Sequence, residues 1–341
     1  MCAPGWWERM VEGPNDKGAE RMKILVNVKL NDRQMEALRA LGSDLEVVRD
    51  LDPERARHEM ADAEVLLCFQ LPGPLSEAKR LRWIQLVSAG AEHVLEAGVE
   101  ATEITVTTAS GIHGTAMAEY TLGVMVMLAR RMPLILRESE RHQWKPSPLR
   151  TYYGDELWGK TLGIVGLGAI GRRVATVARC LGMRVVGLRR SGGAEGLETG
   201  LVDRVFGPDG LLELLAESDF VLVALPLTTE TRGLIGEREL RAMKRGAYLI
   251  NVARGRIVDE GALARALREG WIAGGAFDVF AEEPLPPDSE IWELPNLIVT
   301  PHMAGGTMPY LDRALELFQE NLRRYLAGEP LMNVLDKERG Y

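Results

Sequence analysis

An apolar run that opens directly into three spaced glycines constrains the fold of this chain more than any other feature. Residues 161–171 read TLGIVGLGAIG, with glycines at Gly166, Gly168 and Gly171. Apolar residues that follow at helical spacing form one face: Ile170, Val174, Val177, Ala178 and Leu181. A strand, a tight turn and a helix in this order aim free helix N–H groups at a phosphate. The segment predicts a dinucleotide-binding unit, the alternative being a glycine-rich turn without a ligand.

Short apolar runs alternate with helical segments along the chain, a pattern typical of α/β proteins with parallel sheets. The strands expected before the glycine segment are 23–28 (KILVNV), 64–68 (EVLLC), 83–88 (WIQLVS) and 104–110 (ITVTTAS). Those expected from the glycine segment onward are 161–165 (TLGIV), 184–188 (RVVGL), 220–225 (FVLVAL), 247–253 (AYLINVA), 274–279 (GGAFDV) and 297–301 (LIVTP).

The chain is long enough for two hydrophobic cores. A last helix carries an apolar stripe of Leu311, Leu315, Phe318, Leu322 and Tyr325, and we expect it to return to the first unit. The fold expected is therefore α/β with two doubly wound parallel-sheet domains. A flavodoxin-like substrate domain comprises 22–112 plus 308–341, a Rossmann dinucleotide-binding domain comprises 113–307, and residues 1–21 form a flexible extension.

Composition excludes several classes of partner. The formal net charge of −8 argues against a nucleic-acid ligand, which needs a concentrated basic surface. The longest apolar stretch is far short of the ~20 residues that span a bilayer, and residues 1–21 lack a signal-peptide apolar region. The three cysteines show no metal or disulfide spacing, so we expect Cys68 and Cys180 to be buried thiols in a cytoplasmic protein.

The end of the second Rossmann strand bears on the choice of cofactor. An acidic residue about 20 positions after the glycines normally accepts hydrogen bonds from the adenosine ribose. This chain instead has Arg189, Arg190 and Ser191 there. A guanidinium binds a 2′-phosphate that a carboxylate would repel, which favours NADP(H) over NAD(H). The alternative is that the arginines only cover a solvated loop while NAD binds.

Three candidate catalytic residues follow the later strands of this domain, where doubly wound sheets gather their ligands. His302 directly follows LIVTP and could exchange a proton near neutral pH. Glu283, in FDVFAEEPLP, could hold that ring, and Arg254, in INVARGRIVDE, could bind a keto-acid carboxylate and carbonyl. Taken singly, they could equally be a capping histidine, a surface glutamate and a solvated arginine.

In this order after GLGAIG, the segments NVARGRIVDE, FDVFAEEPLP and TPHMAGG resemble the D-2-hydroxyacid dehydrogenase family. The similarity runs from about Met22 to the C-terminus and includes AEYTLG, ETRGLIG and ENLRRYLAGEPLMNV. It implies that Arg254 orients a 2-keto acid, that His302 is the acid/base, and that Glu283 partners His302.

The resemblance also implies binding residues outside this trio. Asp278 would hold the nicotinamide carboxamide, and backbone N–H groups at Ala89 and Gly90, in SAGAEHV, would bind the substrate carboxylate. Glu92 stands where the family often has Asp, which leaves the preferred substrate size open. The expected cofactor-binding residues are Gly166, Gly168, Ala169, Ile170, Gly171, Arg189, Arg190, Ser191, Pro226 and Asp278.

The predicted activity is hydride transfer between NADP(H), with NAD(H) as the alternative cofactor, and a small 2-keto or 2-hydroxy acid, similar to that of glyoxylate and hydroxypyruvate reductases. A homodimer built through the apolar segment after residue 113 is expected; on periodicity alone, that segment could instead be a buried interdomain helix. The trio leaves open oxidation of 3-phosphoglycerate or phosphite, whereas Glu283 disfavours a formate dehydrogenase. A dinucleotide-sensing, corepressor-like protein is the alternative outside enzymes.

Overall fold

The computed structural model describes residues 21–144, 152–191, 193, 195 and 199–341. All but one residue of the expected N-terminal extension, 1–21, lies outside the described part. The chain divides into two compact units, one combining residues up to Ile112 with Met308–Tyr341 and the other comprising His113–Thr307. Each unit contains its own parallel sheet, as the sequence predicts.

The first unit is built around a five-stranded parallel sheet of order β2-β1-β3-β4-β5. Its strands are β1 (Met22–Asn27), β2 (Leu45–Arg49), β3 (Val65–Cys68), β4 (Trp83–Leu86) and β5 (Thr105–Thr107). Its helices are α1 (Asp32–Arg39), α2 (Pro53–Asp62), α3 (Glu92–Glu96) and α10 (Tyr310–Ala327), with short 3₁₀ turns η2 (Leu75–Glu77) and η3 (Val99–Ala101). Side chains alternate along each strand, so one face packs on α1 and α10 and the other on α2 and α3.

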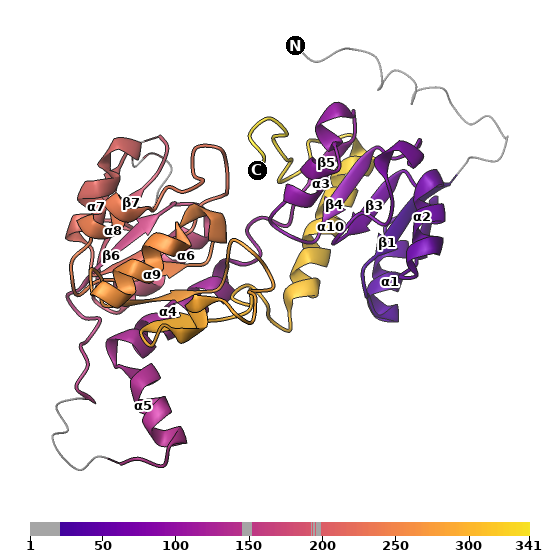
Figure 1. Cartoon of the computed structure of the whole chain (residues 1–341). Helices are drawn as coiled ribbons and strands as arrows, with labels where there is room; N and C mark the ends of the chain where they lie inside the picture. Colours follow the sequence, from indigo (N-terminus) through magenta and orange to yellow (C-terminus); the bar gives the residue numbers. More distant parts are fainter. Residues whose placement is uncertain (1–20, 145–151, 192, 194, 196–198) are drawn as a thin grey trace. The chain divides into compact units, whose positions relative to one another are not determined.

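Helix α10 belongs to this first unit although it ends the chain (Figure 1). The Phe318 ring lies 5.3 Å from the Trp83 ring of β4, and the Tyr325 ring stacks on the Trp83 ring, also at 5.3 Å. This apolar stripe is the one that the sequence pattern indicates.

The second unit contains a seven-stranded parallel sheet of order β12-β11-β10-β9-β6-β7-β8. Its strands are β6 (Thr161–Val165), β7 (Arg184–Leu188), β8 (Arg204–Phe206), β9 (Phe220–Val223), β10 (Tyr248–Asn251), β11 (Gly274–Phe277) and β12 (Leu297–Val299). Its helices are α4 (Gly114–Ala129), α5 (Met132–Glu140), α6 (Ala169–Cys180), α7 (Leu211–Glu217), α8 (Glu237–Ala242) and α9 (Glu260–Glu269), with 3₁₀ turns η5 (Pro208–Gly210), η6 (Gly255–Ile257) and η7 (Glu290–Glu293).

Helices cover both faces of this sheet. Helices α4 and α6 pack on one face, and α7, α8 and α9 pack on the other. Both sheets are thus doubly wound, which confirms the expected fold class. Strand order reverses between β6 and β9, because successive strands are added on opposite sides of β6. In open α/β sheets this switch point is where ligands bind, at the carboxyl ends of the strands.

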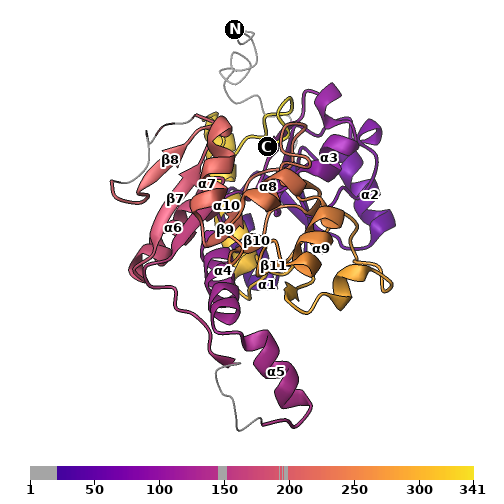
Figure 2. The same ribbon diagram turned by 60° about the vertical axis from the view of Figure 1, so that its left-hand side comes forward.

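The apolar segment after residue 113 forms two helices rather than one. Helix α4 ends at Ala129, and Arg131 adopts a left-handed φ of 55° before α5 begins. Helix α4 buries Val124, Met125 and Leu128 in its own unit. Helix α5 extends away from the rest of the unit (Figures 1 and 2) and leaves Leu134 and Leu136 exposed.

The two described cysteines differ in burial. Cys68 is fully buried, and burial raises the pKa of its thiol to about 12. Cys180 is exposed, so the expectation of a buried thiol there is wrong. It is the last residue of α6 and lies outside the face that Val174, Ala175 and Ala178 bury.

Candidate active site

Gly166 turns the chain in the crevice between β6 and β9. Its φ is +112°, and a Cβ there would lie 2.4 Å from the carbonyl oxygen of Ala224, just after β9. Its N–H donates to Leu188 O, at the end of β7, at 3.1 Å. Only glycine fits this combination of positive φ and close backbone approach. The first glycine is therefore required by the fold.

The other two glycines of the segment differ sharply in their surroundings. A Cβ at Gly171 would lie 2.1 Å from Gly166 O, so this residue lets α6 pack closely on the turn. A Cβ at Gly168 would meet no atom within 4 Å. Gly168 is the N-cap of α6, with no side-chain cap over the N–H groups that begin at Ala169 and Ile170. Open space above uncapped helix donors fits the pyrophosphate of a dinucleotide.

The residues expected at the adenosine end lie directly beyond β7. Arg189 is half-buried, and its Nη1 donates to the carbonyl oxygens of Gly193 at 3.3 Å and Glu195 at 2.7 Å. Arg190 and Ser191 are exposed. The Arg189 guanidinium thus shapes the loop that it begins. Pro226 is exposed after β9, and its carbonyl oxygen accepts from Thr231 Oγ1 at 2.7 Å.

Arg254 lies three residues beyond β10. The side chain of Asn251, which is buried, fixes the backbone of this segment by two hydrogen bonds. Asn251 Nδ2 donates to Arg254 O at 3.0 Å, and its Oδ1 accepts from Ala253 N–H at 3.0 Å. The half-buried Arg254 side chain donates from Nη1 to Ala253 O at 2.7 Å. A Cβ at Gly255 would lie 1.9 Å from Phe280 C, so the loops after β10 and β11 pack backbone to backbone.

His302 and Glu283 form a hydrogen-bonded pair. His302 Nδ1 lies 2.6 Å from Glu283 Oε2, and Glu283 Oε1 accepts from Phe280 N–H at 2.9 Å. With Nδ1 donating its proton to the carboxylate, Nε2 is the atom left to exchange a proton with another molecule. The His302 side chain is 52% exposed, so a ligand has access to it.

Parallel register brings these three catalytic candidates to one edge of the sheet. Asn251 pairs with Phe277, and Phe277 pairs with Val299. Arg254 and His302 each follow their strand by three residues, and Glu283 lies in the loop between β11 and β12. The carboxyl edge that carries the glycine turn therefore carries all three side chains.

Asp278 lies at the same edge but is 1% exposed. Its Oδ1 accepts from Thr300 Oγ1 at 2.6 Å and from Met303 N–H at 2.8 Å, and its Oδ2 accepts from Ala304 N–H at 2.8 Å. The carboxylate thus binds the loop that carries His302. Its role at a nicotinamide carboxamide stays a prediction.

The loop expected to bind a substrate carboxylate lies in the first unit, after β4. Ser88 Oγ donates to Gly90 O at 2.8 Å, and Tyr310 donates to Val87 O at 2.6 Å. Among the described residues, neither Ala89 nor Gly90 uses its N–H to donate to another protein group. The two N–H groups are therefore available to an anion. Glu92 is the first residue of α3.

Several residues that build the site were not predicted from the sequence. Asn251 and Gly255 shape the Arg254 loop, and Thr300 binds Asp278. Tyr120, on α4, reaches Thr300 with its hydroxyl at 2.7 Å. Asn251 lies at the end of a buried strand, which was the one available signal for it. The hydrogen bond of Tyr120 joins residues 180 positions apart and has no local signature.

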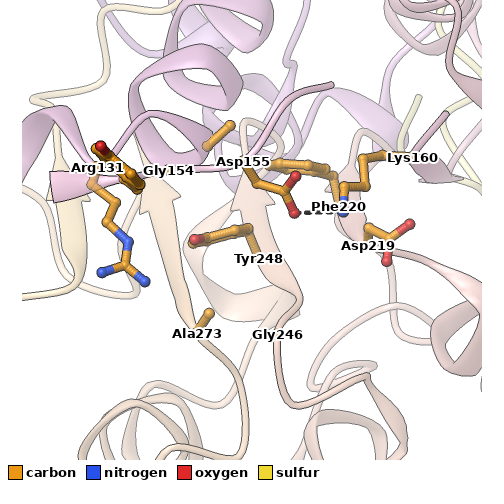
Figure 3. A pocket seen from close by; sticks show the side chains of 11 residues that line it. Arg131, Gly154, Asp155, Lys160, Asp219, Phe220, Gly246, Tyr248 and Ala273 are labelled. Carbon is orange, nitrogen blue, oxygen red and sulfur yellow. Dashed lines mark ion pairs between the residues drawn. The ribbon is translucent and has the colours of Figure 1, made fainter. Parts of the chain in front are cut away.

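A cavity of about 360 Å³ lies at the opposite, amino edge of the second sheet (Figure 3). Lys160 and Asp219 precede β6 and β9, and Tyr248 begins β10. Lys160 Nζ and Asp155 Oδ2, which point toward each other in Figure 3, form an ion pair at 2.5 Å. These two charged groups neutralise one another, and the cavity lies at the sheet edge opposite to the one that carries His302.

The described residues contain no cluster of three or more His, Cys, Asp or Glu that could hold a metal ion. No helix among them has both the length and the apolar character needed to cross a bilayer.

Comparison with known proteins identifies related sequences and structures. The family model described as D-isomer specific 2-hydroxyacid dehydrogenase, NAD binding domain, matches residues 122–304. A glyoxylate reductase of Aeropyrum pernix is 39% identical over 273 residues, which cover 77% of this chain and 79% of that protein.

Two solved structures extend the likeness to the whole fold. A D-isomer specific 2-hydroxyacid dehydrogenase of Xanthobacter autotrophicus Py2, in complex with NADPH and MES, has a TM-score of 0.78 at 31% identity and covers 95% of this chain and 100% of that one. An NADPH-dependent glyoxylate/hydroxypyruvate reductase of Sinorhizobium meliloti, in complex with NADP and sulfate, has a TM-score of 0.79 at 25% identity and covers 94% and 100%.

Proposed function

This chain belongs to the D-isomer specific 2-hydroxyacid dehydrogenase family, and we propose that it reduces a small 2-keto acid with NADPH, glyoxylate and hydroxypyruvate being its best substrates. The observation that carries this proposal is the His302–Glu283 pair on the sheet edge that also holds the Gly166–Gly171 turn. The names of the Aeropyrum pernix and Sinorhizobium meliloti relatives support the substrate class.

The three catalytic side chains have different roles in this reaction. When bound, the reduced nicotinamide supplies a hydride for the carbonyl carbon. His302 donates a proton from Nε2 to the carbonyl oxygen, so that the ketone becomes an alcohol. Glu283 holds the ring through Nδ1 and stabilises the positive charge of the imidazolium before transfer. Arg254 orients the keto acid and stabilises negative charge that develops on its oxygen.

Binding residues complete the assignment. The turn from Gly166 to Gly171 would hold the pyrophosphate, and Asp278 the nicotinamide carboxamide. The N–H groups of Ala89 and Gly90 would bind the substrate carboxylate. Arg190, with Arg189 and Ser191, would bind the 2′-phosphate of NADPH; the complexes of two relatives with NADPH or NADP support this preference.

A homodimer is the proposed assembly, with α5 rather than α4 as the contact surface. Helix α4 buries Val124, Met125 and Leu128 within its own unit and leaves Val126 exposed, whereas the shorter α5 exposes both Leu134 and Leu136. Molar mass from light scattering would test this, with Leu134→Glu/Leu136→Glu as the disrupting variant. A wild-type mass of one chain would contradict the proposed dimer.

Steady-state rates test the proposed activity. We expect NADPH oxidation with glyoxylate or hydroxypyruvate to exceed that with pyruvate or phenylpyruvate in kcat/KM. His302→Ala serves as the control for contaminating activity. Absence of reduction with all four acids would contradict the proposal, and turnover of 3-phosphoglycerate or phosphite instead would assign the same trio to another substrate.

A further inference from the structure

A chain of hydroxyl groups links helix α4 to the loop of His302. The Tyr120 hydroxyl lies 2.7 Å from Thr300 Oγ1, and Thr300 Oγ1 donates to Asp278 Oδ1 at 2.6 Å. The single Thr300 proton is directed to the carboxylate, so Tyr120 must be the donor to Thr300. The hydrogen bonds therefore run in one direction, from Tyr120 to Thr300 and from Thr300 to Asp278.

Asp278 in turn accepts hydrogen bonds from the N–H groups of three consecutive residues of the His302 loop. Its carboxylate accepts from the N–H groups of Met303 and Ala304, each at 2.8 Å, and its backbone oxygen accepts from His302 N–H at 2.8 Å. His302 has a φ of +51°, which is uncommon for a residue other than glycine. Such a conformation persists only where surrounding contacts fix it.

We propose that Tyr120 and Thr300 are positioning residues that fix His302 for proton transfer by acting through Asp278. This inference rests on the proposed function of His302. It gives a role to the AEYTLG segment, which none of the catalytic assignments uses. Neither hydroxyl acts on the reacting atoms directly. Both determine the position of the His302 imidazole.

The Tyr120 hydroxyl can donate its hydrogen bond to Thr300 Oγ1 over a wide range of pH. Burial raises the pKa of Tyr120 to about 12. The proton therefore stays on the phenol through the neutral and mildly alkaline range. The hydrogen-bonded series of Tyr120, Thr300 and Asp278 therefore acts as a brace that holds the His302 loop in place. It is not a path for the catalytic proton.

Three variants and a matched control test the brace. Thr300→Val removes both hydrogen bonds, Thr300→Ser keeps them, and Tyr120→Phe removes only the outer one. The control is Tyr325→Phe, because Tyr325 in the first unit also loses a single hydroxyl bond, donated to Glu64 Oε1 at 2.8 Å. Tyr325 lies in the first unit, whereas Tyr120, Thr300 and His302 lie in the second.

Rates of glyoxylate reduction, normalised to NADPH-binding sites, should separate positioning from stability. Thr300→Val should lower kcat about tenfold to 10²-fold, since small misplacements of a reacting group have effects of this size. Its KM for NADPH should change less than about twofold, and its solvent isotope effect should rise because proton transfer limits the rate more. Tyr120→Phe should show a smaller change of the same kind, while Thr300→Ser and Tyr325→Phe should match wild type.

Hydrogen exchange gives a readout that needs no substrate. The N–H groups of Met303 and Ala304 should exchange faster in Thr300→Val than in wild type or Thr300→Ser. Unchanged exchange, or an unchanged kcat and isotope effect per NADPH-binding site, would overturn the inference. Failure of wild type to reduce any keto acid would refute the proposed function instead, and the exchange rates would still decide whether the brace exists.

Discussion

Glu283 Oε2 and His302 Nδ1 lie 2.6 Å apart, and Glu283 is itself fixed by the Phe280 N–H that its other oxygen accepts at 2.9 Å. The Glu283 carboxylate is therefore held in place where it contacts the His302 imidazole. With Nδ1 engaged, Nε2 is the nitrogen left to exchange a proton. This arrangement makes the roles of the two residues separable by substitution.

Removal of the imidazole should abolish most proton transfer. We expect His302→Ala to lower kcat by about 10²-fold or more while leaving the dissociation constant of NADPH nearly unchanged. Steady-state rates with glyoxylate and fluorescence titration with NADPH measure the two quantities. Near-normal turnover would mean that another group supplies the proton.

Glu283→Gln should also lower kcat strongly, although the side chain keeps its shape. An amide can donate to Nδ1 and so stabilise the wrong tautomer, an effect that reaches about 10⁴-fold in a serine-protease triad. Circular dichroism and thermal unfolding should match wild type. A variant with full activity would show that Glu283 does not orient the ring.

Arg254 is expected to act on the keto acid in both ground and transition states. Arg254→Ala should therefore lower kcat and raise KM for glyoxylate, while Arg254→Lys should recover only part of the loss because it lacks the planar fork. The KM for NADPH is the internal control. An effect confined to the melting temperature would show that Arg254 is structural.

Two strands were not predicted from the sequence, β2 (Leu45–Arg49) and β8 (Arg204–Phe206). Each lies at one edge of its sheet, although the strands at the opposite edges, β5 and β12, were predicted. Figure 2 shows β8 beyond β7 at that edge. An edge strand is covered on fewer sides, so β2 alternates buried and exposed residues and β8 buries only Phe206. Neither segment presents the continuous apolar run by which the other strands were found.

Only part of the candidate site could likewise be predicted from the sequence. Glycine spacing and strand ends indicated the Gly166 turn, Arg254, Glu283 and His302, because each signal is local in the sequence. The brace from Tyr120 through Thr300 to Asp278 depends on tertiary contacts between distant segments. No local pattern distinguishes Tyr120 from any other tyrosine on a largely apolar helix.

The second and third glycines of the turn, Gly168 and Gly171, should respond differently to an added side chain. Gly171→Ala brings a Cβ within 2.1 Å of Gly166 O, so we expect a lower melting temperature or failure to fold. Gly168→Val meets open space in the protein and should fold, yet bind NADPH at least about tenfold more weakly by crowding the pyrophosphate. Calorimetry and NADPH titration make the comparison. Normal NADPH binding by Gly168→Val would place the dinucleotide elsewhere.

The cofactor preference should depend on the loop after β7. Arg189 donates to the carbonyl oxygens of Gly193 and Glu195, so Arg189→Ala changes the shape of the loop as well as its charge. Arg190→Ala removes the exposed guanidinium of the next residue. If its guanidinium binds the 2′-phosphate, NADPH affinity should fall about tenfold, as expected for a charge-assisted hydrogen bond, while NADH affinity stays the same.

A carboxylate at the end of β7 should reverse the preference. Arg189→Asp would repel the 2′-phosphate and offer an acceptor to the ribose hydroxyls, so kcat/KM should fall for NADPH and rise for NADH. Arg189→Ala is its matched control, since both variants lose the hydrogen bonds to the loop carbonyls but only one adds a negative charge. The ratio of kcat/KM for NADPH over NADH is the quantity to follow across wild type and the three variants. A wild-type ratio below one, or a ratio that none of the substitutions changes, would mean that the arginines only cover the loop and that the enzyme uses NADH.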